Sequence, residues 1–294
     1  MSSFVQLLLT GLMVGGIYGL VAIGFVLIYK GTRIFNFAQG ELLMLGAFFC
    51  WAMLVQAHMP LWASVLLTFA LAVAIGFAIE RTALRPMLGQ PILSVIMMTL
   101  ALSVFLSGLV TLIWGGAWKV YPSIIPMGGI NFMGFTLSQQ HLFGFVIALL
   151  TFAAFTLFFR RSRYGLAMRA TAEDQQVARS SGIRVTLVFG LIWAIATLVS
   201  AVGGILLGTI NGVNFTLGQI GLKAIPAALI GGLESIGGAI IGGLIIGILE
   251  SLAAGYIDPL VGGGVREIFP YVVLVIALLF RPYGIFGLKR IERV

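Results

Sequence analysis

The chain of 294 residues is 60% hydrophobic and 9% charged, with a mean hydropathy of +1.13, and this composition excludes an ordinary soluble domain in favour of an integral membrane protein. Its formal net charge of +8 does not indicate nucleic-acid binding, because an excess of Lys and Arg in a membrane protein more often marks the loops that face the cytoplasm. The single cysteine, Cys50, excludes an internal disulfide, and no Cys/His spacing suits a metal site.

Apolar runs long enough to cross a bilayer, which takes roughly 20 residues per helix, occur throughout the chain. They predict an all-α polytopic membrane protein with about 8–9 transmembrane segments, discontinuous helices among them, in a single transmembrane domain over residues 1–294. The first run has no basic residues before it and is too long for a signal-peptide core, so we interpret it as a retained span. In chain order the predicted spans are Val5–Tyr29, Leu42–Gln56, Leu61–Ile79, Pro91–Trp114, Leu142–Phe159, Val185–Ile210, a broken region from Gly218 to Tyr256, and Ile268–Phe280.

Basic residues gather between these spans in four groups, and we place all four on the cytoplasmic side. This assignment puts 14 of the 17 Lys and Arg residues in the cytoplasm, with the N-terminus outside and the C-terminus inside. It makes residues 160–184 a cytoplasmic loop and residues 115–140 an external loop. The groups are Lys30 and Arg33; Arg81 and Arg85; residues 160–184; and Arg281, Lys289, Arg290 and Arg293.

A short polar motif, N-F-x-x-G-[E/Q], occurs at residues 36–41 and again at 214–219. Five predicted spans separate the copies, so the second is inverted relative to the first, as in transporters built from inverted repeats; a chance match is the alternative. In this topology the first copy lies at the inner side and the second at the outer side. Polar groups in such segments predict a translocation path, whose candidates are Asn36, Phe37, Gln39, Gly40, Glu41, Asn214, Phe215, Gln219 and Lys223.

The region Gly218–Tyr256 starts and ends outside in this topology, so it must descend and return, with its turn near Gly231–Gly238. Pro226 and the glycine pairs around the turn leave neither limb comfortable as a full span, which is typical of discontinuous helices. Two ordinary spans joined by a glycine-rich turn are the alternative. We interpret Glu234 as a turn residue and Glu250 as a residue near the membrane interface.

The loop 160–184 holds eight of the 26 charged side chains of the chain. Thr171 followed by Asp174 approximates a capping box and predicts a helix over Gln175–Ser181 that stops at Gly182. A cap, a stop and scattered apolar residues favour a docking surface for another protein, and a plain solvated loop is the alternative.

Three stretches resemble LivH-type permease subunits of branched-chain amino acid ABC importers: GLVAIGFVLIYKGTRIFNFAQGELLMLGAF (19–48), YGLAMRATAEDQQVARSSGI (164–183) and LKAIPAALIGGLESIGGAIIGGLIIGILES (222–251). The resemblance covers nearly the whole chain. It implies a transmembrane permease domain in the bacterial cytoplasmic (inner) membrane, paired with a second permease subunit, a different chain in that family. It also implies two cytoplasmic ATPase subunits and an extracytoplasmic solute-binding protein.

The resemblance further implies that Thr171–Gly182 is the coupling helix that sits in a groove on each ATPase. The residues assigned to this coupling are Arg169, Thr171, Glu173, Asp174, Ala178 and Gly182. One departure is that the widespread importer signature has Glu-Ala-Ala well before its glycine, whereas here Glu173 and Asp174 precede Ala178. The other two stretches therefore carry the identification.

The chain has no G-x-x-x-x-G-K-[ST] phosphate loop, so any ATP is expected to be hydrolysed on partner subunits and no cofactor is expected on this chain. The predicted function is the permease subunit of an importer for branched-chain or related amino acids, without enzymatic activity of its own. The alternative is an autonomous channel or secondary carrier for a small neutral solute. A membrane enzyme would need a nucleophile–base pair or a metal cluster, which the sequence lacks.

Overall fold

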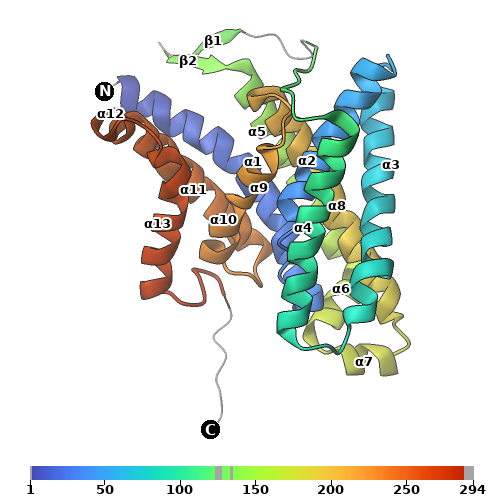
Figure 1. The fold of residues 1–294 in the computed structure, drawn as a ribbon. Coiled ribbons are helices and arrows are strands. Elements are labelled where there is room, and N and C mark those ends of the chain that lie inside the picture. Colours follow the sequence, from blue (N-terminus) through green and yellow to red (C-terminus); the bar gives the residue numbers. More distant parts are fainter. Residues whose placement is uncertain (1, 123–127, 133–134, 288–294) are drawn as a thin grey trace.

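The computed structural model describes residues 2–122, 128–132 and 135–287, and they form a bundle of long helices with a two-stranded hairpin at one end (Figure 1). The first part of the chain contains α1 (Ser2–Thr32), α2 (Gln39–Trp51), α3 (Leu61–Ile79), α4 (Ile92–Trp114), β1 (Gly129–Phe132), β2 (Phe135–Ser138) and α5 (Gln139–Arg161). The second part contains α6 (Arg163–Glu173), α7 (Gln175–Ser180), α8 (Val185–Asn211), α9 (Leu217–Leu222), α10 (Ala224–Gly231), α11 (Ile236–Tyr256), α12 (Asp258–Val261) and α13 (Val265–Phe280).

Two of the helices end in π-helical turns. α2 continues into η1 (Ala52–Gln56), and α3 continues into η2 (Glu80–Leu84) and the short 3₁₀ turn η3 (Arg85–Met87). The wider turn at η2 carries a buried carboxylate, Glu80, whose two oxygens accept hydrogen bonds from the Arg85 guanidinium at 3.1 and 2.7 Å. The Arg85 guanidinium therefore compensates the buried negative charge of Glu80, which follows the apolar end of α3.

The prediction of an all-α polytopic protein is confirmed. Within the described residues, seven helices are long and apolar enough to cross a membrane: Phe4–Thr32, Gln39–Gln56, Leu61–Met87, Ile92–Trp114, Gln139–Arg161, Val185–Asn211 and Ile236–Tyr256. The shorter apolar segment Leu217–Gly231 and the 16-residue α13 complete the bundle. The hairpin of β1 and β2, paired antiparallel from Gly129–Ser138 to Phe132–Phe135, lies in the predicted external loop and was not predicted.

The broken region differs from prediction in its second limb. The first limb is discontinuous, since α9 ends at Leu222 and α10 begins at Ala224. The second limb, α11, is one uninterrupted helix of 21 residues, so the expectation that neither limb forms a full span is wrong there. Glycine does not break α11 because neighbouring backbones fill the space beside Gly238, Gly242, Gly243 and Gly247.

Helix α1 forms the centre of the bundle, and 94% of its apolar 18-residue stretch is buried inside the protein. Along one side its backbone touches that of α11: a Cβ atom added to Gly11 or Gly15 would lie 2.6 or 2.7 Å from the carbonyl oxygen of Gly247 or Gly243. Such contact needs residues without side chains, as expected where lipid provides no hydrophobic drive for helix association. By contrast, α4 and α5 lie at the outside of the bundle, where 17% and 22% of their apolar 18-residue stretches are buried.

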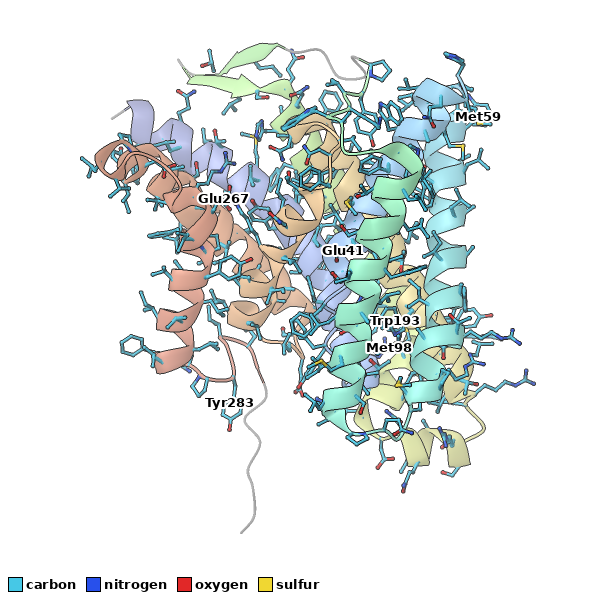
Figure 2. The ribbon with its side chains drawn as sticks, in the orientation of Figure 1. Glu41, Met59, Met98, Trp193, Glu267 and Tyr283 are labelled. Atoms are coloured by element: carbon cyan, nitrogen blue, oxygen red, sulfur yellow. The ribbon has the colours of Figure 1, made fainter. Side chains whose placement is uncertain are left out.

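The structure places the predicted inner and outer loops at opposite ends of the bundle. The start of α1 and the β1–β2 hairpin lie at one end, and α6 and α7 lie at the other (Figure 1). Tyr283, which follows α13, is drawn at the same end as α7 (Figure 2). The positive-inside rule predicts that the end with α6 and α7 faces the cytoplasm, and we name the two ends by this prediction. Lys289, Arg290 and Arg293 of the fourth basic group lie outside the described residues, as does part of the external loop 115–140.

The described start of the external loop is fixed to the bundle. Lys119 and Val213 form a β-bridge through their backbones, and the Lys119 ammonium lies 4.5 Å from the centre of the Trp51 ring. The Tyr121 hydroxyl donates to the Ala47 carbonyl at 2.7 Å, and burial raises the pKa of Tyr121 well above its usual value. These contacts hold the loop against the outer ends of α2 and α8.

Candidate functional site

The two copies of the polar motif meet inside the bundle. A Cβ atom added to Gly40 would lie 2.1 Å from the Gly218 carbonyl oxygen, and one added to Gly221 would lie 2.8 Å from the Gly40 Cα. The start of α2 and α9 therefore cross with their backbones in contact. The prediction that the copies lie at opposite sides of the membrane is wrong, because the chain folds back into the bundle before each motif. The inverted repeat itself stays a prediction.

The first motif is a closed hydrogen-bond network. The Asn36 side-chain oxygen accepts from the Ala38 backbone N–H at 3.0 Å, and its amide donates to the Gln39 side-chain oxygen at 2.9 Å. The Gln39 amide in turn donates to the Ser200 hydroxyl at 2.5 Å on α8. Asn36 and Gln39 are fully buried. Their side chains hydrogen-bond to each other, to the backbone and to α8 at the point where the chain re-enters the bundle and begins α2.

The second motif repeats only the first part of this arrangement. The Asn214 side-chain oxygen accepts from the Thr216 N–H at 2.8 Å and from the Thr216 hydroxyl, which fixes the turn before α9. Phe215 is 51% exposed and Gln219 is exposed, whereas their counterparts are more buried: Phe37 packs on Phe35 and Glu41 is only 9% exposed. The equivalent positions therefore have different environments.

Glu41 lines an open groove between the start of α2 and one face of α4. The other lining residues are Ser103, Val104, Ser107, Gly108, Thr111 and Leu112, all on α4. Figure 2 draws Glu41 between the end of the bundle marked by Met59 and the end that carries α7. The sequence prediction missed α4, although Ser103, Ser107 and Thr111 are spaced four apart and so share one helix face.

Lys223 lies apart from this groove, in a buried ionic network. Its ammonium lies 3.2 Å from Glu250 Oε1 and 2.9 Å from Glu267 Oε2, and the side chains of Lys223 and Glu250 are only 5% and 2% exposed. Glu250 Oε1 also accepts from Arg266 Nε at 3.1 Å and from the Tyr18 hydroxyl at 3.3 Å. The network joins the α9–α10 break to α1, α11 and α13, and we assign it to holding that break in place.

The interpretation of Glu250 as a near-interface residue stays a prediction. Its carboxylate is buried among the helices and paired, because Lys223 lies at the break in the first limb and places a cation within reach of α11. A lone acidic residue in an apolar helix is a signal for such a partner. The interpretation of Glu234 as a turn residue is confirmed, since it lies between the end of α10 and the N-cap Ser235 of α11.

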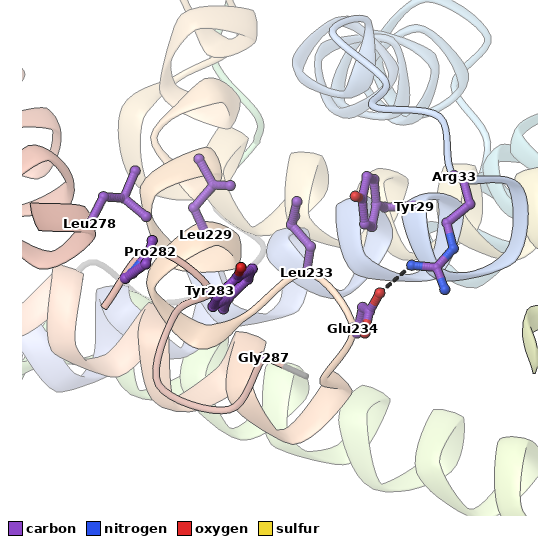
Figure 3. A pocket seen from close by; sticks show the side chains of 9 residues that line it. All are labelled: Tyr29, Arg33, Leu229, Leu233, Glu234, Leu278, Pro282, Tyr283 and Gly287. Carbon is purple, nitrogen blue, oxygen red and sulfur yellow. Dashed lines mark hydrogen bonds and ion pairs between the residues drawn. The ribbon is translucent and has the colours of Figure 1, made fainter. Parts of the chain in front are cut away.

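An ion pair between Arg33 and Glu234 links the end of α1 to this turn (Figure 3). It borders a cavity of about 280 Å³, whose lining residues include Tyr29, Leu229, Leu233 and Tyr283. The hydrogen bond from Arg33 to the Glu234 carboxylate raises the pKa of Arg33 above its usual value. The guanidinium therefore stays charged, and the pair fastens the cytoplasmic end of α1.

The cytoplasmic segment forms two helices, so the prediction of one coupling helix over Thr171–Gly182 is corrected. Ser162 caps α6 by accepting from the Gly165 N–H at 2.8 Å, and α6 runs through Thr171 to Glu173. Asp174 then caps α7 by accepting from the backbone N–H groups of residues 176 and 177. Thr171 is buried inside α6 and caps nothing, because the earlier cap at Ser162 already starts a helix across it.

The residues predicted to couple to an ATPase divide into two sets. Glu173, Asp174 and Gly182 are exposed at the cytoplasmic end, and Gly182 has the positive φ of 83° expected of a helix stop. Thr171 and Ala178 are buried. Arg169 faces inward, where its guanidinium donates to the Phe159 carbonyl and stacks over the Phe159 ring.

Two large apolar side chains of this segment are exposed: Leu166 of α6 at 60% and Val177 of α7 at 61%. They lie on the cytoplasmic layer formed by α6 and α7 (Figure 1). Exposed apolar groups beside exposed charges are typical of a protein-binding surface. Among the residues that the structure describes, no group of three or more His, Cys, Asp or Glu could hold a metal ion.

The chain matches the family described as branched-chain amino acid transport system / permease component over residues 7–278. It is 34% identical to the high-affinity branched-chain amino acid transport system permease proteins BraD of Pseudomonas aeruginosa and LivH of Escherichia coli strain K12, over 99% of this chain and 98% of each relative. A chain of PsaBC from Streptococcus pneumoniae, solved in complex with a Fab, has a similar fold, with a TM-score of 0.52 and 13% identity over 97% of this chain and 94% of that one.

Proposed function

Because this chain belongs to the branched-chain amino acid transport system permease family, we propose that it is the membrane permease subunit of an ATP-binding-cassette importer for branched-chain or related amino acids. It is a multi-pass protein of the bacterial inner membrane. The observation that carries the proposal is the full-length match to BraD and LivH, which extends through the crossing of α2 and α9 and through the cytoplasmic helices.

The proposal includes the partners that such a subunit needs. A second permease subunit, of a different sequence, completes the pathway. Two cytoplasmic ATPases bind and hydrolyse ATP, and an extracytoplasmic binding protein delivers the amino acid to the end that carries the β1–β2 hairpin. This chain contributes no ATPase site and binds no cofactor.

Force from the ATPases enters through α7. Asp174 fixes the start of this helix, Gly182 fixes its end, and Val177 and Leu166 provide apolar contact area between them. Arg169 and Thr171 act differently from the sequence-based assignment: they lie on the inner side of α6 and transmit its movement to α5 and α8.

Reconstitution tests this function. We would place the chain in liposomes alone and together with a candidate second permease and two candidate ATPases from the same organism, add the binding protein outside and ATP inside, and follow labelled leucine. Uptake is expected only from the full assembly. An ATPase in which the phosphate-loop Lys is replaced by Ala is the matched control and should abolish it. Rapid flux through the lone chain would instead identify a channel or secondary carrier.

A further inference from the structure

The groove beside Glu41 contains a carboxylate oxygen without a partner. Glu41 is 9% exposed, and within the described part of the chain its Oε2 atom is buried and accepts no hydrogen bond. The other oxygen lies toward Gly218, where an added Cβ would be 3.4 Å from it. A buried carboxylate oxygen with no donor is costly, so a site of this kind is suited to a ligand that supplies the donor.

The opposite wall of the groove is a row of hydroxyl groups on α4. Ser103, Ser107 and Thr111 extend along one helix face for roughly 12 Å at 1.5 Å per residue. Thr111 donates its hydroxyl to the Ser107 carbonyl at 2.9 Å, so the hydroxyls that remain for a ligand are those of Ser103 and Ser107. Two serine hydroxyls beside a buried carboxylate favour a polar compartment in the assembled transporter.

We propose that this groove is a subsite for a zwitterionic amino acid in transit, in which Glu41 accepts hydrogen bonds from the α-ammonium group. The Ser103 and Ser107 hydroxyls donate to the α-carboxylate, and Val104 and Leu112, which line the same groove, contact the aliphatic side chain. The inference rests on the proposed function and adds the residues that meet the substrate.

Charge supports this ligand. Glu41 is the one ionisable side chain that lines the groove in the described structure, so a group bearing a positive charge is the complementary ligand. The groove is open, since its lining residues Val104 and Leu112 are 74% and 87% exposed, and it becomes an enclosed site only when another chain of the assembled transporter covers α4.

Uptake by the assembled transporter tests the subsite. The variants are Glu41→Gln, which keeps the shape and removes the charge, Glu41→Asp, and Ser107→Ala. Ser94→Ala, an exposed hydroxyl at the start of α4 outside the groove, is the matched control. Three quantities are measured for each: recovery of the complex, ATPase activity stimulated by the binding protein, and ATP-driven leucine uptake.

We expect Glu41→Gln to lower leucine uptake about tenfold, since a charge-assisted hydrogen bond is lost, while recovery and stimulated ATPase activity stay within about twofold. Glu41→Asp should retain more leucine uptake than Glu41→Gln. Ser107→Ala should lower leucine uptake about threefold, and Ser94→Ala should take up leucine at the wild-type rate. Normal uptake by Glu41→Gln overturns the subsite. Loss of complex recovery also overturns it and assigns Glu41 to an ion pair with the second permease subunit.

A second measurement on the full chain does not depend on transport. In a Cys50→Ala background, Ser107→Cys is treated with a cationic and with a neutral methanethiosulfonate of similar size. A carboxylate in the groove should favour the cationic reagent, and Glu41→Gln should reduce that preference several-fold. An unchanged preference overturns the role of Glu41. If instead the wild-type assembly moves no amino acid at all, the proposed function itself fails.

Discussion

Single residues in this protein are constrained most strongly where charge is buried. Lys223 and Glu250 lie 3.2 Å apart with side chains 5% and 2% exposed, and both belong to a network with Arg266 and Glu267. Removing one partner of a buried pair leaves the other uncompensated, at a cost of about 3–5 kcal/mol. The pair therefore matters more to the fold than to the path for which Lys223 was predicted.

Glu250→Gln and Lys223→Met are each expected to lower the unfolding temperature of the purified protein and the fraction that elutes as a single species in detergent. The double variant Lys223→Met/Glu250→Gln should recover part of the loss, because no unpaired charge remains between the two positions. Glu173→Gln, an exposed carboxylate, is the control and should have little effect. Additive losses in the double variant would contradict a coupled pair.

The contact between the two motifs gives a second prediction for single residues. Gly40→Ala would place a Cβ 2.1 Å from a backbone oxygen of α9, so the helices must separate, at a cost of about 1–3 kcal/mol. Gly218→Ala would place a Cβ 3.4 Å from its nearest neighbour, an ordinary contact. Thermal unfolding should therefore show a clear loss for Gly40→Ala and a small one for Gly218→Ala. Equal losses would mean that the crossing is looser than described.

At the scale of single elements, the helix α7 depends on its two ends. Asp174 accepts from two backbone N–H groups and Gly182 has φ of 83°, a conformation that disfavours a residue with a branched side chain. A helix of six residues has few other stabilising contacts, so its order is sensitive to caps that contribute about 1 kcal/mol each.

Asp174→Ala and Gly182→Val are expected to weaken association with the ATPases while leaving membrane insertion intact. Gly182→Asn should be tolerated, because Asn adopts the left-handed conformation and the space around Gly182 is open. Thr171→Val should also be tolerated, since Thr171 is buried and does not cap the helix. Co-purification of ATPase with the tagged chain measures all four, and normal recovery of the Gly182→Val complex would count against docking through α7.

The helices themselves could largely be predicted from the sequence, because hydrophobic runs report directly on burial in a bilayer. Two features could not. Ser162 and Asp174 both carry side chains that cap helices, and only the folded chain shows that Ser162 starts α6 and removes Thr171 from the capping role. Likewise, the sequence reveals that Lys223 and Glu250 are charged but not that α11 brings them within hydrogen-bond distance.

At the scale of the whole molecule, the order of the elements sets which surfaces face which compartment. α6 and α7 lie at one end of the bundle and the β1–β2 hairpin at the other (Figure 1). The excess of Lys and Arg predicts that the α6–α7 end lies in the cytoplasm. Among the candidate path residues, Asn36 and Gln39 form hydrogen bonds within the bundle, while the groove at Glu41 opens on α4, which no sequence motif marked.

Cysteine labelling checks this orientation. Gln176 is exposed on α7, whereas Thr171 is too buried to report on access. In a Cys50→Ala background, Gln176→Cys should react with a membrane-impermeant thiol reagent in inside-out vesicles and not in intact cells. A cysteine at Thr136, in the exposed part of the hairpin, should show the reverse pattern. Reaction of Gln176→Cys in intact cells would invert the topology.

The glycine contacts between α1 and α11 limit how this protein can change shape. Backbones that interlock at Gly11, Gly15, Gly243 and Gly247 leave no room for one helix to slide or roll against the other. We therefore expect α1 and α11 to move together during transport, with any relative displacement falling on helix contacts that lack interlocked glycines.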